Sequence, residues 1–374
     1  MDNLYRKILD DITPYEPGKP IEEVKRELGL DKVYKLASNE NPYGPSGKVL
    51  DAIMDAARNA NRYPDGGCFY LRQKLSAMLD VPPSELVFGN GSDELIILAL
   101  RAFVHPGEEV IISDPTFMVY KIGARIAEAE VVAVPAVDFQ YDLEAMLAKI
   151  TPKTKMIFIA NPENPTGTCI SPEKMEELIE GVPRNVVVFI DEAYYEFAKG
   201  EGYPETIKYT RRKDRNVIVS RTFSKAYSLA GLRLGYIIAR DDISRAVNKV
   251  REPFNVNSIA QAAAIAALDD IDSLRASLEL VRTEKKRIYA ALDGMDVKYV
   301  PSRANFILID TGRDSKEVFQ RVLKEGVIVR EMSAWGLRGF VRMNIGLKEE
   351  NDEFIRAFDK ALREIPKQAI SGKR

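Results

Sequence analysis

The sequence NVIVSRTFSKAYSLAGLRLGY, residues 216–236, contains two apolar runs joined by a polar loop that carries Lys225 and Arg233. The first run, from Val217 to Val219, predicts a buried β-strand, and a second strand is expected from Tyr236 onward. The lysine and the arginine therefore stand just beyond strand ends, where α/β folds bind ligands. A lysine that is partly desolvated there, close to other cations, has a lowered pKa and becomes a nucleophilic amine. A solvated loop lysine is the commoner state, so the other motifs must decide between the two.

Strand-like and helix-like segments alternate on both sides of this stretch. Apolar runs predict strands at 86–88, 109–113, 130–134, 155–160, 185–191 and 216–220, with helical patterns between most of them. Such alternation predicts an α/β fold, with a mostly parallel sheet covered by helices on both faces. After residue 255, long helical patterns and a few strands predict a smaller α+β domain. We therefore expect an N-terminal arm (1–35) packed on the small domain or on a partner subunit, a large domain (36–255) and a small domain (256–374).

Composition excludes several classes of protein. The chain has 374 residues, with 54 Lys and Arg against 56 Asp and Glu, so a net charge of −2 gives no reason to expect nucleic acid as a partner. No signal peptide and no membrane-length apolar run is seen. Cys68 and Cys169 lack metal-like spacing and are expected to be reduced thiols in the cytoplasm. His105 is the single histidine, so we expect neither a His-based triad nor a metal site.

Residues 89–94, GNGSDE, follow a short strand and precede a helix. A glycine turn before a helix exposes backbone amides at the positive helix end, which predicts an anion cradle formed around Gly91, Ser92 and Asp93. The segment is not a dinucleotide-binding fingerprint, because Glu94 stands where the third glycine would be. A plain tight turn is an equally good interpretation of this motif alone.

Two further strand ends carry polar side chains. Asp191 ends the apolar run 185–191, and a buried carboxylate is costly there unless it meets a cation. It alternatively caps the following turn, and Tyr194 is close enough to reach the same site. Residues 161–167, NPENPTG, follow another strand, and two X-Pro pairs make a stiff loop that can hold Asn164 against a ligand. A purely structural turn is about as good an explanation.

Together, a nucleophilic lysine, a strand-end aspartate, an amide on a stiff loop, an arginine and an anion cradle suit pyridoxal 5′-phosphate. The chain also resembles the fold-type I pyridoxal-phosphate-dependent aminotransferases over nearly its whole length, and among them most closely the histidinol-phosphate aminotransferases. The resemblance is carried by NPENPTG, DEAYYEF and SKAYSLAGLRLGY, and the subgroup is indicated by PYEPG and RYPDG.

The resemblance implies a role for each matching residue. Lys225 would hold the cofactor covalently and act as acid and base, and Asp191 would pair with the ring nitrogen of the cofactor. Tyr194 and Asn164 would both hydrogen-bond the phenolic oxygen of the cofactor ring. Phe117 would stack on the ring. The phosphate would be held by Gly91, Ser92, Asp93, Thr222, Ser224 and Arg233. Tyr63 would reach the phosphate in a neighbouring subunit, which implies a homodimer with shared sites. Substrate binding would fall to Tyr15, Asn164, Arg330 and Arg342.

The implied reaction converts L-histidinol phosphate and 2-oxoglutarate to imidazole acetol phosphate and L-glutamate, a step of histidine biosynthesis. An aromatic amino acid aminotransferase, or an enzyme with both activities, is the nearest alternative. A phosphothreonine decarboxylase and a non-catalytic protein that senses the cofactor are further alternatives. A dehydrogenase would depend on residues 89–91 alone, and Glu94 argues against it.

Overall fold

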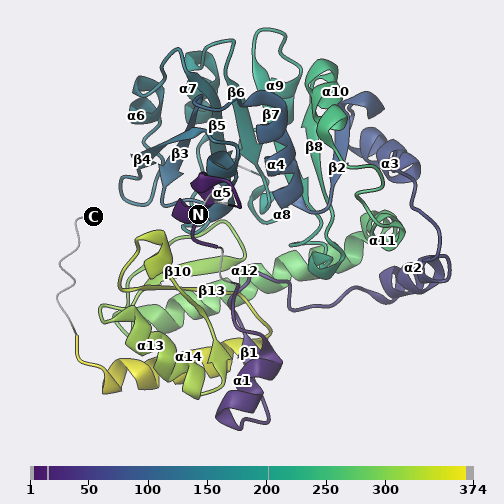
Figure 1. The fold of residues 1–374 in the computed structure, drawn as a ribbon. Helices are drawn as coiled ribbons and strands as arrows, with labels where there is room; N and C mark the ends of the chain where they lie inside the picture. The colour runs from purple at the N-terminus through teal and green to yellow at the C-terminus, as the bar shows by residue number, and fades with distance from the viewer. Residues whose placement is uncertain (1–3, 15–16, 201, 368–374) are drawn as a thin grey trace.

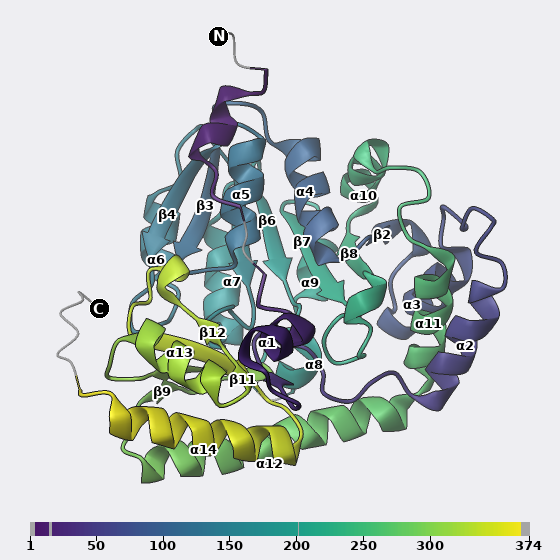
Figure 2. The ribbon, with the colours of Figure 1, turned by 60° about the horizontal axis from the view of Figure 1, so that its bottom comes forward.

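The computed structural model describes residues 4–14, 17–200 and 202–367. Two layered units lie one above the other, and the long helix α12 (Ile271–Gly294) runs from below the large unit into the small one (Figure 1, Figure 2). The strands are β1 (Tyr34–Lys35), β2 (Leu86–Gly89), β3 (Glu109–Asp114), β4 (Glu130–Pro135), β5 (Thr154–Ala160), β6 (Val187–Asp191), β7 (Asn216–Thr222), β8 (Gly235–Ala239), β9 (Tyr299–Val300), β10 (Phe306–Asp310), β11 (Val327–Ile328), β12 (Arg330–Glu331) and β13 (Phe340–Asn344).

The helices surround these strands. They are α1 (Ile21–Leu28), α2 (Gly47–Ala57), α3 (Phe69–Leu79), α4 (Ser92–Phe103), α5 (Met118–Ile126), α6 (Leu143–Ala148), α7 (Pro172–Gly181), α8 (Tyr195–Ala198), α9 (Ile207–Thr210), α10 (Asp241–Val250), α11 (Ser258–Asp269), α12 (Ile271–Gly294), α13 (Ser315–Lys324) and α14 (Lys348–Glu364). Short 3-10 helices are η1 (Lys7–Asp11), η2 (Pro83–Glu85), η3 (Ala230–Leu232) and η4 (Ser333–Trp335). Within the described ranges, no helix combines the length and the apolar character needed to cross a membrane.

The large sheet has the strand order β2-β8-β7-β6-β5-β3-β4. Its pairs from β4 to β7 are parallel, whereas β8 is antiparallel to both neighbours, which confirms the mostly parallel sheet. Successive residues of β6 point to opposite faces. Val188 and Ile190 pack toward the helices α2, α3, α6, α7 and α11, and Val187 and Phe189 toward α4, α5 and α10. Burial on both faces explains why these strands are unbroken apolar runs.

The second sheet is antiparallel, in the order β12-β13-β10-β9. Val341 and Met343 of β13 pack with α12, α13 and α14. Because side chains alternate along a strand, Arg342 and Asn344 point to the opposite face, toward the large sheet. The helix α11, which follows the expected domain boundary at residue 255, packs against α2 and α3.

The N-terminal arm contacts both units. The helix η1 lies against α5 (Figure 2), and Arg6 donates to the carbonyl of Ile126 at 2.9 Å. Further along, Val24 of α1 packs against Leu323 and Ile328 beside the small sheet. The strand β1 extends this contact by pairing in parallel with β11. The arm therefore crosses from the large unit to the small one before the chain enters α2.

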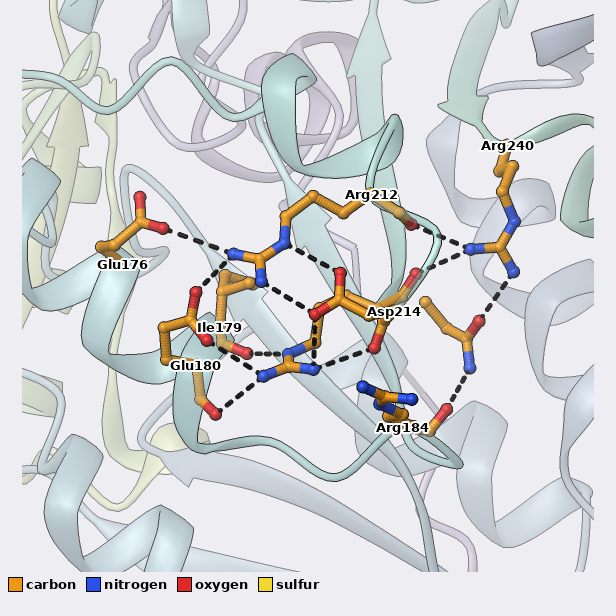
Figure 3. Close-up of polar contacts among 9 residues, drawn as sticks. Glu176, Ile179, Glu180, Arg184, Arg212, Asp214 and Arg240 are labelled. Carbon is orange, nitrogen blue, oxygen red and sulfur yellow. Dashed lines mark hydrogen bonds and ion pairs between the residues drawn. The ribbon is translucent and has the colours of Figure 1, made fainter.

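An ion-pair network closes the edge of the large sheet at which the strands β6 and β7 begin (Figure 3). Arg215 donates to the carbonyls of Ile179 and Glu180 at 2.8 and 3.1 Å, and to the carboxylate of Asp214 at 3.0 Å. Arg212 grips the same Asp214 through two nitrogens. These contacts tie the end of α7 to the start of β7 and satisfy helix carbonyls that lack intrahelical partners.

Candidate active site

A cavity of about 580 Å³ opens at the carboxyl ends of the large sheet's parallel strands and faces the small sheet. Most of the residues expected from the sequence line it: Ser92, Asp93, Phe117, Asn164, Asp191, Tyr194, Thr222, Ser224, Lys225, Arg233 and Arg342. They come from strand ends, helix starts and one strand of the small sheet, so residues far apart in the sequence meet in one chamber. This is where ligands bind in open α/β sheets.

Lys225 lies in the turn after β7, and its Nζ donates to the carbonyl of Ser38 at 3.2 Å. Burial, and after it the positive charge of Arg342, lower the pKa of this amine to about 8, although Asp93 and Glu40 act in the opposite direction. About a tenth of the amine is therefore uncharged at pH 7, and this is the form that attacks a carbonyl carbon.

Asp191 is the last residue of β6 and is 4% exposed. Tyr120 donates its hydroxyl to Oδ2 at 2.8 Å. In the described part of the chain, the other oxygen, Oδ1, has no hydrogen-bond partner of normal geometry. Burial raises the pKa of the carboxyl to about 7 in spite of the Tyr120 bond. An unpaired carboxylate oxygen at this depth is suited to a ligand that brings a positively charged N–H group.

The anion cradle forms where α4 begins. Gly91 is the N-cap residue and has a φ of +84°, and it carries no side chain that could accept from the first amides of the helix. Arg233 lies over this turn: its Nη2 is 3.3 Å from Oδ2 of Asp93, and its Nη1 is 3.5 Å from Oγ of Ser224. Thr222 accepts from the Ser224 amide at 3.1 Å. Amides at a helix start, hydroxyls and a guanidinium together suit a phosphate group.

The antiparallel orientation of β8 explains how Arg233 reaches the cradle. Because β8 runs against β7, its first residues lie at the same sheet edge as the last residues of β7. Gly235 pairs with Thr222 there, and a Cβ on Gly235 would lie 2.7 Å from the amide nitrogen of Ser92. The absence of a side chain at Gly235 thus allows the start of α4 to lie directly on the sheet.

Three side chains surround the space between Asp191 and Lys225. Tyr194 is 4% exposed, and its hydroxyl accepts from Nδ2 of Asn39 at 2.8 Å. Asn164 presents its side chain from the stiff loop, where Oδ1 accepts from Nη1 of Arg342 at 2.5 Å. Phe117 stands at the start of α5 and packs edge-on against Tyr120, with ring centroids 5.6 Å apart. A flat ring would be enclosed by these groups.

Two arginines meet on the small sheet. Arg342 of β13 is buried, and its Nη2 donates to the carbonyl of Ala37 at 3.1 Å. Arg330 of β12 is its direct cross-strand partner, so the two side chains project from the same face of the sheet. The Arg330 guanidinium lies 5.0 Å from the Trp335 ring centroid, outside the lining of the cavity. Like charges directly opposite each other repel, and an anion between them would relieve the repulsion.

The remaining expected residues, Gly91, Tyr63 and Tyr15, are not among those that line the cavity. Gly91 lies under Arg233, and a Cβ there would be only 2.4 Å from Nη2. Tyr63 is 83% exposed and stacks on Phe254 at 4.8 Å, away from the cavity of its own chain. Tyr15 lies outside the described residues.

Some contacts were missed from the sequence. Tyr120 occupies a buried position on α5, where the helical pattern indicates only core packing. Glu163 lies beneath Asn164, 2% exposed, and accepts from the hydroxyl of Thr116 and the amide of Asn164, both at 2.9 Å. Burial raises the pKa of Glu163 to about 8. Asn39 was part of an apparent loop. The local pattern does not reveal the contacts of Tyr120 with Asp191, of Glu163 with Thr116 and of Asn39 with Tyr194, because each of these joins distant segments.

Comparisons with known proteins agree with this geometry. The family model for aminotransferase class I and II matches residues 31–358. A histidinol-phosphate aminotransferase from Moorella thermoacetica is 46% identical over 360 residues, covering 96% of this chain and 92% of that protein. Histidinol-phosphate aminotransferase 2 from Pseudomonas aeruginosa is 44% identical, covering 94% and 95%. The crystal structure of histidinol-phosphate aminotransferase from Sinorhizobium meliloti in complex with pyridoxal-5′-phosphate superimposes with a TM-score of 0.88 at 28% identity, covering 97% and 99%.

The fold, the cavity and the family match define a pyridoxal-phosphate-dependent transaminase of fold type I. The chain belongs to the class I and II aminotransferases, and its relatives place it in the histidinol-phosphate aminotransferase family within that class.

The residues present fit this cofactor. The unpaired oxygen of Asp191 would accept a hydrogen bond from a ring N–H, and the start of α4 with Arg233 would suit a phosphate. Across the described ranges, no cluster of three or more His, Cys, Asp or Glu side chains is arranged to hold a metal ion.

Proposed function

We propose that this transaminase takes the amino group from L-histidinol phosphate and passes it to 2-oxoglutarate, giving imidazole acetol phosphate and L-glutamate. The observation that carries the substrate assignment is Arg342, which lines the cavity from the small-domain side, with Arg330 as its cross-strand partner just outside the lining. The names of the curated relatives support the same substrate.

For the cofactor, we propose the following assignment. Lys225 holds it covalently, Asp191 accepts from its ring N–H, and Tyr194 and Asn164 contact its phenolic oxygen. Phe117 covers the ring. The phosphate is held at the start of α4, by Gly91, Ser92, Asp93, Thr222, Ser224 and Arg233. When bound, pyridoxal phosphate supplies an electron sink for the substrate carbon that loses its proton.

In the chemical step, we propose that Lys225 acts as general base and then as general acid. Its lowered pKa, about 8, allows the neutral amine to accept the proton from the amine-bearing carbon of the substrate. Asp191 has the complementary task, because its negative charge keeps the ring N–H protonated. Because Asp191 and the cofactor ring would both be buried, the attraction between the Asp191 carboxylate and the protonated ring nitrogen would be stronger than in water.

The substrate's anionic end is assigned to Arg342 and Arg330, with Asn164 and Tyr15 as further contacts. An arginine forks onto a phosphate or a carboxylate with equal geometric ease, so one pair serves histidinol phosphate and then 2-oxoglutarate. Arg342 is held for this task by Asn164 and the carbonyl of Ala37.

The test is a steady-state assay of the purified enzyme with L-histidinol phosphate and 2-oxoglutarate. We expect imidazole acetol phosphate to form, with a kcat/KM well above that for phenylalanine. Formation of no product above background would overturn the substrate assignment. A kcat/KM that favours phenylalanine would point instead to the aromatic amino acid aminotransferase.

We also propose a homodimer with shared active sites. Apolar side chains of α2, α3 and the adjoining loops are exposed in the single chain: Tyr43, Leu50, Met54, Tyr63, Phe69, Tyr70 and Phe254. A group of large apolar side chains exposed on neighbouring elements is typical of an interface. Tyr63 would then contact the phosphate site of the partner subunit. A cytoplasmic location is proposed with it, and the two free thiols, Cys68 and Cys169, are in keeping with a reducing compartment.

A further inference from the structure

Asn39 has an unusual backbone that the small sheet holds in place. It is 2% exposed, lines the cavity and has a φ of +54°, in the left-handed region that costs a side-chain-bearing residue energy. Its N–H donates to Oδ1 of Asn344 at 3.1 Å, and its carbonyl accepts from Nδ2 of Asn305 at 3.1 Å. Two side-chain amides thus fix the peptide groups of one residue, and strain held in this way is found where a side chain must be aimed.

The side chain of Asn39 is aimed at Tyr194. Nδ2 donates to the tyrosine hydroxyl at 2.8 Å, in a buried setting. The Tyr194 ring is held from the other side by Phe306, which packs edge-on with centroids 5.1 Å apart. A phenolic hydroxyl has one hydrogen to donate and lone pairs that accept. Because the Asn39 amide occupies an acceptor site of the oxygen, the hydroxyl hydrogen is turned away from Asn39.

We propose that Asn39 is a positioning residue that directs the hydroxyl hydrogen of Tyr194 toward the phenolic oxygen of the bound cofactor. The proposal rests on the proposed function, which gives Tyr194 its contact with that oxygen. An aspartate at position 39 would do the opposite, since a carboxylate only accepts and would take the tyrosine hydrogen for itself. An alanine would remove the donor that sets this direction.

The same contacts link the two units of the molecule. Asn344 is the last residue of β13 and Asn305 immediately precedes β10, both in the small sheet, whereas Tyr194 follows β6 of the large sheet. Asn39 stands between them, so the position of the small sheet sets the position of the amide that orients Tyr194. A displacement of the small sheet would therefore change the position of the Asn39 amide relative to Tyr194.

The experiment is a pH titration of the absorbance of the cofactor bound to the enzyme. A hydrogen bond donated to the phenolic oxygen draws off negative charge, so its loss raises the pKa of the enzyme-bound chromophore. We expect Asn39→Ala to raise that pKa by roughly 0.4 to 1 unit, the equivalent of one hydrogen bond. Asn39→Asp, which is nearly isosteric, should raise it at least as far, and Tyr194→Phe should match Asn39→Asp.

The double variant Asn39→Ala/Tyr194→Phe should show no shift beyond that of Tyr194→Phe alone. A matched control is Asn41→Ala, which removes an amide of the same loop that bonds the Ala226 carbonyl and Ser277 instead, and should leave the pKa unmoved. The proposal is overturned if the Asn39 shift persists without the tyrosine hydroxyl. It is equally overturned if Asn41→Ala gives the same shift, or if Asn39→Ala changes only KM. If Tyr194→Phe itself gives no shift, the Tyr194 assignment of the proposed function has failed instead.

Discussion

Among the lysines that the structure describes, Lys225 and Lys285 are buried enough for their pKa to fall to about 8. Lys285 donates to the carbonyls of Ser302 and Ala304, in the loop between β9 and β10, and does not line the cavity. Lys225 faces the cavity, with Asp191 and Arg342 among the residues that line the same chamber. A lowered pKa therefore does not distinguish the reactive lysine from Lys285. Lys225 is distinguished by its place at a strand end, opposite a buried carboxylate.

We predict that replacing Asp191 by asparagine stabilises the enzyme without the cofactor and destabilises it with the cofactor bound. Its pKa is raised to about 7, so the folded apoenzyme holds this proton more tightly than the unfolded chain does. Between about pH 4 and pH 7 this group therefore makes the apoenzyme less stable as pH rises. We expect Asp191→Asn to stabilise the apoenzyme at pH 8 by ~4 kcal/mol and to have little effect at pH 4.

With the cofactor bound, the same substitution should destabilise, because the ring N–H loses its anionic partner. Denaturant unfolding of both forms at the two pH values measures this. An Asp191→Asn apoenzyme that is less stable than the parent at pH 8 would contradict the burial argument.

At the scale of the element, the start of α4 is predicted to need a bare backbone. Gly91→Ala adds a Cβ 2.4 Å from Arg233 at a φ of +84°. We expect cofactor affinity to fall by at least ~10-fold, since the phosphate site must deform. The matched control is Gly107→Ala, with a φ of +80° and nothing within 4 Å of the new Cβ. It carries the same backbone strain, so cofactor titration of the two variants separates strain from obstruction. Equal losses would contradict the prediction.

The ion-pair network at the other edge of the large sheet is predicted to serve stability alone. Arg215→Ala removes the donors to two helix carbonyls and to Asp214, so the free energy of unfolding should fall by ~1–3 kcal/mol. KM should not change, because the network lies before the start of β7, whereas the cavity is lined by the last residues of β6 and β7, Asp191 and Thr222. Arg245→Ala is the control, since its pair with Asp241 is exposed and should be worth under about 0.5 kcal/mol. A KM change in Arg215→Ala would refute the separation of roles.

The elements show what a sequence can and cannot predict. Strands such as β5, β6 and β7 were predicted because burial on both faces leaves an unbroken apolar run. The orientation of β8 was not, since pairing direction has no local signature, and it is β8 that brings Arg233 to the cradle. Site residues that stand at strand ends, such as Asp191, were predictable for the same reason. Asn39, Tyr120 and Glu163 were not, because their partners lie on other segments.

At the scale of the whole molecule, the shared site predicts complementation between two inactive variants. Lys225→Ala lacks the reactive amine, and Tyr63→Ala lacks the residue expected to reach the partner subunit. A mixed dimer contains one site with both residues intact. Equal mixing after subunit exchange should therefore restore about a quarter of the parental activity. Activity that stays at the sum of the two variants would contradict shared sites, and sedimentation of the parent as a monomer would contradict the dimer itself.

The account depends most on which amine holds the cofactor. Borohydride reduction of the loaded enzyme, followed by peptide mapping, fixes the cofactor to the lysine that carries it. We predict the label on the peptide that contains Lys225 and none on the peptide that contains Lys285. Label on Lys285, or the same labelling in the Lys225→Ala variant, would contradict it.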